Sequence, residues 1–272
     1  MRTSNPVLKQ SAFAPAHRGA TIGSSLEEQE RLSRMTIQGT LAKTAMLLAV
    51  AVVAASFTWQ KASLLGTEIG AAKTLAMWSL GGMIGGFVVS LVIMFKPKLA
   101  PTLGLPYAAL EGLFLGAVSG MYSQTFGRAE EALLGLGGGI VFQAVTLTFA
   151  VTLAMLGLYA FRIIKVTERL RSIIFAATGG IMLFYAASFV LGFFGIELPL
   201  IHSTGMYGIG FSVFVVGLAA FNLLLDFDMI ERGAEAGAEK HMEWYGAVGL
   251  MITLVWLYIE ILRLLAKLRS ND

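Results

Sequence analysis

The sequence contains no cysteine and little charge. The absence of Cys from its 272 residues excludes disulfides, thiolate metal sites and thiol nucleophiles. Charged residues make up 14% of the chain, against about 25% in a typical soluble domain. Apolar residues make up 56%, and the mean hydropathy is +0.74. This composition predicts an integral membrane protein whose main partner is the lipid bilayer.

Catalytic signatures are also missing. The sequence has no HExxH or GxGxxG motif, and its three His residues are scattered between a polar tail and two loops. An intramembrane aspartyl protease needs aspartates on facing helices, whereas Asp226 and Asp228 are two residues apart on one helix. We therefore expect no enzyme and no cofactor. The spacing of the acidic residues leaves the question of a bound metal open.

The net charge of +3 does not indicate nucleic acid as a partner, because the basic residues lie in short loops between apolar runs. Most of the 20 Lys and Arg residues fall on one side if the amino terminus is inside. We therefore expect a cytoplasmic amino terminus and an outside carboxyl terminus. Residues 1–36 are polar, lack the apolar core of a signal peptide and predict a retained, partly disordered cytoplasmic tail. Within this tail, Leu26–Arg34 can form a short surface helix, and a protein-binding role for it stays open.

Apolar runs long enough to cross a bilayer occur seven times, since a crossing needs about 20 residues. The fold class predicted is an all-α integral membrane protein with seven transmembrane helices in one domain, 37–268, followed by a short tail, 269–272. The predicted spans are 39–59, 74–95, 104–124, 135–160, 173–194, 205–227 and 245–265. Small residues at four-residue spacing, as in GGMIGG, predict a compact monomeric bundle and leave a homo-oligomer open.

Ionisable residues inside the spans are functional candidates, because a charge in the hydrocarbon layer is unfavourable. Glu111 lies about 10 Å below the cytoplasmic boundary of the third span. Its alternative interpretation is a protonated Glu that hydrogen-bonds a neighbouring helix. Lys43 lies one turn inside the first span and is alternatively a snorkelling lysine. Glu260, near the outer side of the last span, has Arg263 one turn further on as a possible ion-pair partner.

A second group of carboxylates follows the sixth span. Asp226 and Asp228 end this span at the expected cytoplasmic rim. Beyond them an acidic residue recurs every four positions, which makes one acidic stripe if the segment is helical: Glu231, Glu235, Glu239 and Glu243. A solvated face and weak attraction of calcium are both open interpretations. The segment DFDMIE does not match an EF-hand loop.

Several segments, taken in order, resemble a bacterial branch of the Bax inhibitor-1 family, also called the transmembrane Bax-inhibitor-motif family. They are SNPVLKQSAF, MTIQGTLAKTA, ALEGLFLGAVSG, LLLDFDMIERG and TLVWLYIEILRLLAKLRS. The resemblance implies three helix pairs around a central seventh helix, in the bacterial inner membrane. It also implies a pH-sensitive calcium leak channel, in which one aspartate closing the sixth helix and one early in the seventh share a proton.

Asp226 matches the first of these aspartates, and Asp228 takes the place of an uncharged residue and more naturally begins the acidic loop. The position expected for the second aspartate falls near Thr253, in a stretch without any acid. Because Glu111 lies at a similar depth, we hypothesise that Asp226 and Glu111, with Lys43 as an alternating partner, form a latch over a cation path.

The same resemblance implies an alternative function. Some bacterial relatives are described as regulators that bind a membrane-bound protease without transporting anything, and the polar tail is suited to such binding. A third possibility, a proton-coupled transporter, is less favoured, because Pro106 is the only proline inside the seven spans.

Overall fold

The computed structural model of the protein describes residues 33–65, 69–126, 139–192, 194–195, 203 and 205–270. Within these ranges seven helices are long and apolar enough to cross a membrane, which confirms the predicted number. They are α2 (Ile37–Leu65), α3 (Ile69–Phe95), α4 (Ala100–Phe126), α5 (Ile140–Ala160), α6 (Glu168–Gly192), α8 (Met206–Glu235) and α9 (Met242–Arg269), with a 3₁₀ turn, η3 (Pro97–Leu99), before α4. Most of the predicted tail, including most of its expected helix, lies outside the described residues.

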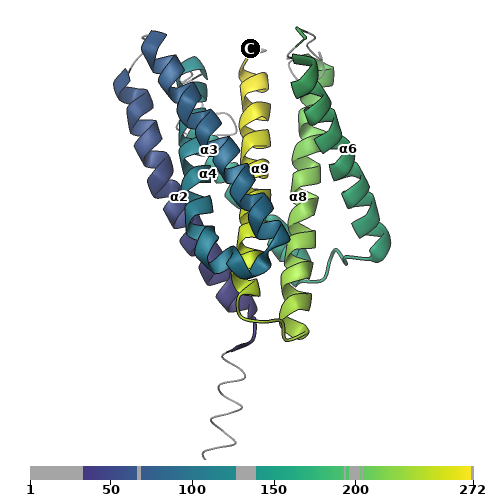
Figure 1. Ribbon diagram of the computed structural model, residues 1–272. Coiled ribbons are helices and arrows are strands. Elements are labelled where there is room, and N and C mark those ends of the chain that lie inside the picture. The colour runs from purple at the N-terminus through teal and green to yellow at the C-terminus, as the bar shows by residue number, and fades with distance from the viewer. Residues whose placement is uncertain are drawn as a thin grey trace, which may run out of the picture.

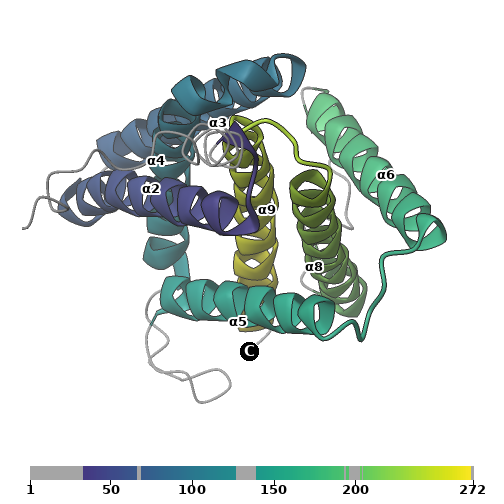
Figure 2. The same cartoon turned by 90° about the horizontal axis from the view of Figure 1, so that it is seen from below.

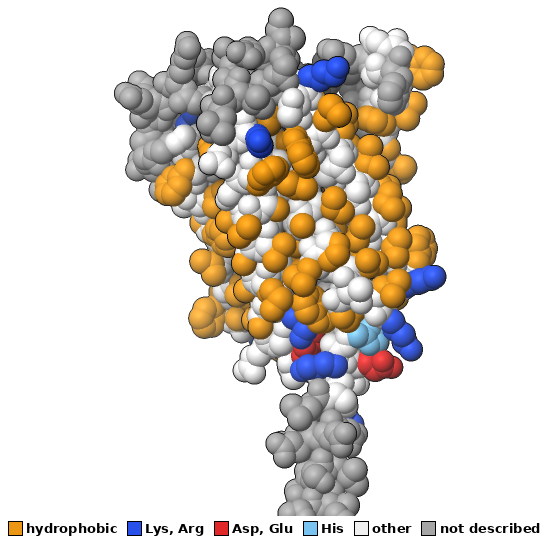
Figure 3. Space-filling view, turned by 60° about the vertical axis from the view of Figure 1, so that its left-hand side comes forward, with side chains coloured by type: hydrophobic (Ala, Val, Ile, Leu, Met, Phe, Trp, Pro, Cys, Tyr) orange, Lys and Arg blue, Asp and Glu red, His pale blue; other side chains and the backbone are white. Residues whose placement is uncertain are grey.

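The outer surface of the helices is mainly apolar at the level of the membrane. Large hydrophobic side chains such as Val53, Leu183 and Phe87 are more than half exposed. Figure 3 shows hydrophobic side chains across the middle of one face, with the acidic side chains of that face gathered at its lower end. Helices that are apolar on every side are typical of membrane spans, because lipid replaces water as their solvent. We call the end of the bundle where α2 and α9 begin the tail end, and the other the far end.

Helix α9 lies near the middle of the bundle, as the view from below shows (Figure 2). Its buried side chains run from Glu243 near the tail end to Lys267 near the far end. Helices α2, α4, α5 and α8 pack against it, and α6 packs on the outer side of α8 (Figure 1). The last helix is therefore the one whose polar side chains are best shielded from lipid.

Glycines bring α4 close to α2. A Cβ atom on Gly112 or Gly116 would overlap the backbone carbonyls of Ala51 and Ala55. On the other side of α4, a Cβ atom on Gly82 of α3 would come within 2.7 Å of the Leu110 carbonyl oxygen. Such close backbone approach is how helices associate in lipid.

Helix α8 is longer than the sequence predicts. It continues through Asp228 to Glu235, about two turns beyond the expected end at 227. Ile230 is buried, so this extension packs against the bundle and does not belong to a loop. The helix stops before Gly237, which has a left-handed φ of 64°. The chain then pairs with the segment that enters α2: Met35 N donates to Ala238 O at 2.7 Å, and Lys240 N donates to Ser33 O at 2.8 Å.

Candidate functional site around α9

Glu243, in the first turn of α9, is the centre of a buried cluster at the tail end. Its side chain is fully buried. One carboxylate oxygen accepts hydrogen bonds from Thr36 N at 2.9 Å, Thr36 Oγ1 at 2.8 Å and Lys240 Nζ at 2.8 Å. The other oxygen binds Lys43 Nζ. A buried carboxylate with two cations and two further donors is well satisfied, and the cluster joins the beginnings of α2 and α9.

Two neighbours complete this cluster. A Cβ atom on Gly39 would overlap the Glu243 carboxylate, so the space beside α2 is available only because this residue is glycine. Lys43 Nζ also lies 5.6 Å from the ring centroid of Trp244, within the range of a cation–π contact. Lys43 is therefore held by α9 from two sides, and it does not extend along the lipid surface as a snorkelling lysine would.

Asp226 lies deeper in the bundle, on the side of α8 that faces α9. The side chain of Thr253 on α9 interacts with its carboxyl group. The carboxyl oxygen Oδ2 is buried and makes no hydrogen bond within the described part of the chain. Thr253, the position where the resemblance implies a second aspartate, thus does face Asp226. A buried polar atom without a partner is unusual and calls for an explanation.

Glu111 is bound on another side of the bundle. Its carboxyl group interacts with the Tyr107 hydroxyl one turn earlier on α4. It also lies against α3, where a Cβ atom on Gly86 would come within 2.7 Å of Glu111 Oε1. Among the described contacts, none joins Glu111 to Asp226 or Lys43. The hypothesised latch is therefore not assembled in this structure, because Glu111 faces α3, while Lys43 and Asp226 contact different residues of α9.

Asp228 is paired and largely buried, which corrects its assignment to a loop. Arg171 Nη2 of α6 lies 2.6 Å from Asp228 Oδ2, and Arg232 Nε lies 2.8 Å from the same oxygen. One turn on, Glu231 accepts hydrogen bonds from Arg162 Nη2 at 2.7 Å and from the Tyr159 hydroxyl. These pairs tie α8 to α6 and to the end of α5, and Asp228, Glu231 and Arg162 line a cavity of about 660 Å³ at the tail end.

The four glutamates do not form one stripe. Glu231 and Glu235 belong to α8, Glu239 lies in the following turn, and Glu243 is buried in α9, because the helix is interrupted at Gly237. Among the described residues there is no group of three or more His, Asp or Glu side chains arranged to hold a metal ion. Weak cation attraction by these residues stays a prediction.

A second buried cluster lies nearer the far end. Glu260 is buried, and Arg263 Nη1 lies 2.9 Å from both of its carboxylate oxygens. Tyr185 of α6 joins this pair: its hydroxyl donates to Glu260 Oε1 at 3.0 Å and accepts from Arg263 Nη1 at 2.7 Å. Further along α9, Lys267 Nζ donates to the Gly208 carbonyl at 3.0 Å. The predicted neighbours Glu260 and Arg263 therefore lie together, with a tyrosine that the sequence analysis did not identify.

The sequence analysis also missed the burial of Glu243. The sequence did contain a signal for its contact with Lys43. Glu243 lies just before one apolar run, and Lys43 lies near the start of another. Oppositely charged residues at the same membrane depth tend to pair, because an unpaired charge there is unfavourable. Thr36, Tyr159 and Tyr185 carried no comparable signal, because uncharged side chains are common throughout the apolar spans.

The family model described as Bax inhibitor 1 like matches residues 5–270, nearly the whole chain. A search of curated proteins found no match.

Proposed function

The chain belongs to the Bax inhibitor 1 like family, and on this basis we propose that it is a pH-sensitive cation leak channel with calcium as the permeant ion. The proposal places the protein in the bacterial inner membrane, with the tail end facing the cytoplasm. The surplus of basic residues on that side supports this orientation.

The observation that carries the proposal is the carboxyl group of Asp226. Its Oδ2 atom is buried between α8 and the central helix without a hydrogen-bond partner among the described residues. Binding or release of a proton there changes the charge between these helices and the partners that the carboxyl group needs. In this proposal Asp226 couples pH to the packing of α8 against α9.

The two other proposed gating residues act from the sides of the path. Lys43 holds the second turn of α2 against α9 through Glu243, so opening at the tail end requires this ion pair to move or break. Glu111 lies between α3 and α4, where a change in its protonation alters its interaction with Tyr107. In this proposal the three residues influence one path without contacting one another.

The proposal is tested with the purified full-length chain in liposomes that contain a calcium indicator. We expect calcium influx whose rate changes between two pH values, and we expect Asp226→Asn to remove most of that change. Glu168→Gln serves as the matched control, because Glu168 is an exposed carboxylate at the start of α6. The proposal is wrong if Asp226→Asn and Glu111→Gln both leave the rate and its pH profile unchanged.

The alternative function is a regulator that binds a membrane-bound protease and conducts nothing. One feature favours it: the segment that follows the tail, residues 33–35, is joined by backbone hydrogen bonds to the α8–α9 loop, so the tail enters the bundle beside the Glu243 cluster. Deletion of residues 1–32 separates the two functions. Loss of protease capture with intact flux supports both roles, and absence of flux in the intact protein supports the regulator alone.

A further inference from the structure

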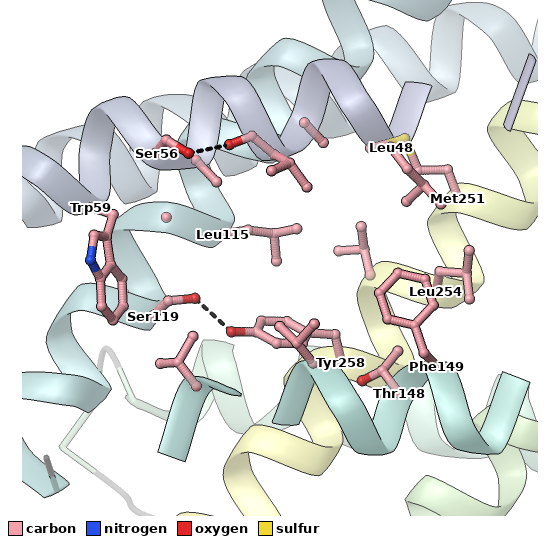
Figure 4. Close-up of a pocket in the computed structure, with 17 residues that line it drawn as sticks. Leu48, Ser56, Trp59, Leu115, Ser119, Thr148, Phe149, Met251, Leu254 and Tyr258 are labelled. Carbon is pink, nitrogen blue, oxygen red and sulfur yellow. Dashed lines mark hydrogen bonds between the residues drawn. The ribbon is translucent and has the colours of Figure 1, made fainter. Parts of the chain in front are cut away.

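A cavity of about 330 Å³ lies among α2, α4, α5 and α9 (Figure 4). Its inner wall comes from the central helix, through Met251, Leu254 and Tyr258, and its floor comes from Leu115 of α4. This cavity is separate from the charged clusters, since it contains no ionisable carboxylate, Lys, Arg or His side chain.

The hydroxyl groups that line the cavity are already hydrogen-bonded to the protein. Ser56 donates to Val52 O at 2.8 Å, and Thr148 donates to Ala144 O at 2.7 Å. The hydroxyls of Ser119 and Tyr258 bond each other at 2.7 Å (Figure 4). The remaining wall is aliphatic or aromatic, so a hydrated cation would lose its water without gaining ligands. The chemistry of the wall suits a hydrocarbon occupant.

The cavity opens sideways, toward the lipid. Val52 of α2 and Phe149 of α5 line it and are also 64% and 52% exposed, so the opening lies between these two helices. Both residues belong to apolar membrane spans, which places the opening within the hydrocarbon layer. The inside of the cavity is therefore continuous with the lipid-facing surface of the protein.

We propose that this cavity binds one acyl chain of a bilayer phospholipid, which enters between α2 and α5. Apolar cavities of about 150 Å³ hold a molecule such as benzene, so a cavity of about 330 Å³ accommodates a segment of an acyl chain. Trp59 lines the part of the cavity formed by the last turns of the α2 span, and tryptophan favours the membrane interface, where the headgroup would remain.

The bound chain would contact the segment of α9 that contains Thr253. Met251, Leu254 and Val255 surround Thr253 in sequence, and Thr253 faces Asp226 on the other side of α9. The inference of an acyl-chain site does not rest on the proposed channel function, because it concerns binding alone.

The experiment uses the full-length chain in bilayer nanodiscs that contain phosphatidylcholine with a diazirine near the end of one acyl chain. After irradiation, labelled peptides are located by mass spectrometry. We expect labelling at cavity residues, in peptides containing Phe149 or Met251. Val52→Trp, which fills the opening, is expected to reduce this labelling several-fold. Val53→Trp is the matched control, because Val53 is 73% exposed on the same helix and does not line the cavity.

Three outcomes would overturn the proposal: labelling confined to outward residues such as Val53 and Leu153, equal labelling of the cavity in both variants, or labelling that depends on the headgroup. The first of these corresponds to ordinary lipid contact around the protein. Nanodiscs of phosphatidylglycerol with the same acyl chains should label the cavity equally if the chain is what binds. If Val52→Trp does not fold, Val145→Phe on the α5 side of the opening gives the same test.

Discussion

Lys43 and Glu243 are 200 residues apart in the chain, and their ion pair joins the second turn of α2 to the first turn of α9 inside the bundle. The carboxylate is fully buried, while the lysine is only partly exposed. A buried ion pair contributes little over an apolar pair of the same shape, but loss of one member is unfavourable, because the other is left without compensation. The pair therefore fixes how the beginnings of these helices fit together.

A double-mutant cycle tests this pair. We expect Lys43→Met to lower the free energy of unfolding by about 2 kcal/mol, less than for an isolated buried pair because Lys240 still binds Glu243. Glu243→Gln should also destabilise, and the double variant should lose less than the sum of the two. Chemical denaturation in detergent micelles measures all three. Strictly additive losses would show that the two residues do not act together.

Gly39→Ala should disturb the same cluster from the backbone side. The added methyl group overlaps the Glu243 carboxylate and forces it away from Lys43 or Thr36, so we expect a loss of about 1 to 3 kcal/mol. Gly81→Ala is the matched control, because a Cβ atom there would meet nothing within 4 Å beyond the adjoining residues of its own helix. The control should be neutral or stabilising by up to about 1 kcal/mol, since alanine is the better helix former. Equal behaviour of the two variants in thermal unfolding would contradict the geometry.

The variant Thr253→Asp tests whether the contact between Thr253 on α9 and Asp226 on α8 influences calcium flux. This prediction rests on the proposed channel function. It places a second carboxyl group beside Asp226, and two such groups in an apolar site titrate as a coupled pair. We expect the pH profile of calcium flux in liposomes to acquire an additional step. Thr253→Val, which only removes the hydroxyl, should keep a single step. If the pH profile of calcium flux were unchanged in Thr253→Asp, this position would have no influence on the proposed cation path.

The fold could be predicted in its main features, because length and hydropathy alone identify a membrane span. The number of helices followed from counting the apolar runs, whereas the place of Thr253 opposite Asp226 followed from the resemblance to the family. The rotation of each helix about its axis could not be predicted, since spans that are apolar on all sides do not reveal which face turns inward. For this reason Glu111 was expected beside Asp226, although it faces α3.

The prediction of one acidic stripe was wrong for a different physical reason. A repeat of four aligns side chains only on an uninterrupted helix, and Gly237 ends α8 in the middle of the repeat. That glycine was visible in the sequence and was the available warning. The burial of Glu243 follows from the contact between α2 and α9, a relationship between distant segments that spacing along one helix does not contain.

The backbone pairing of residues 33–35 with the α8–α9 loop also determines how mechanical force would travel through the molecule. Any pull on the amino-terminal segment is borne first by the Met35–Ala238 and Lys240–Ser33 hydrogen bonds, before it reaches α2. The loop that receives this load lies between the helix carrying Asp226 and the helix carrying Glu243. Tension on the tail would thus act first on the loop between α8 and the central helix.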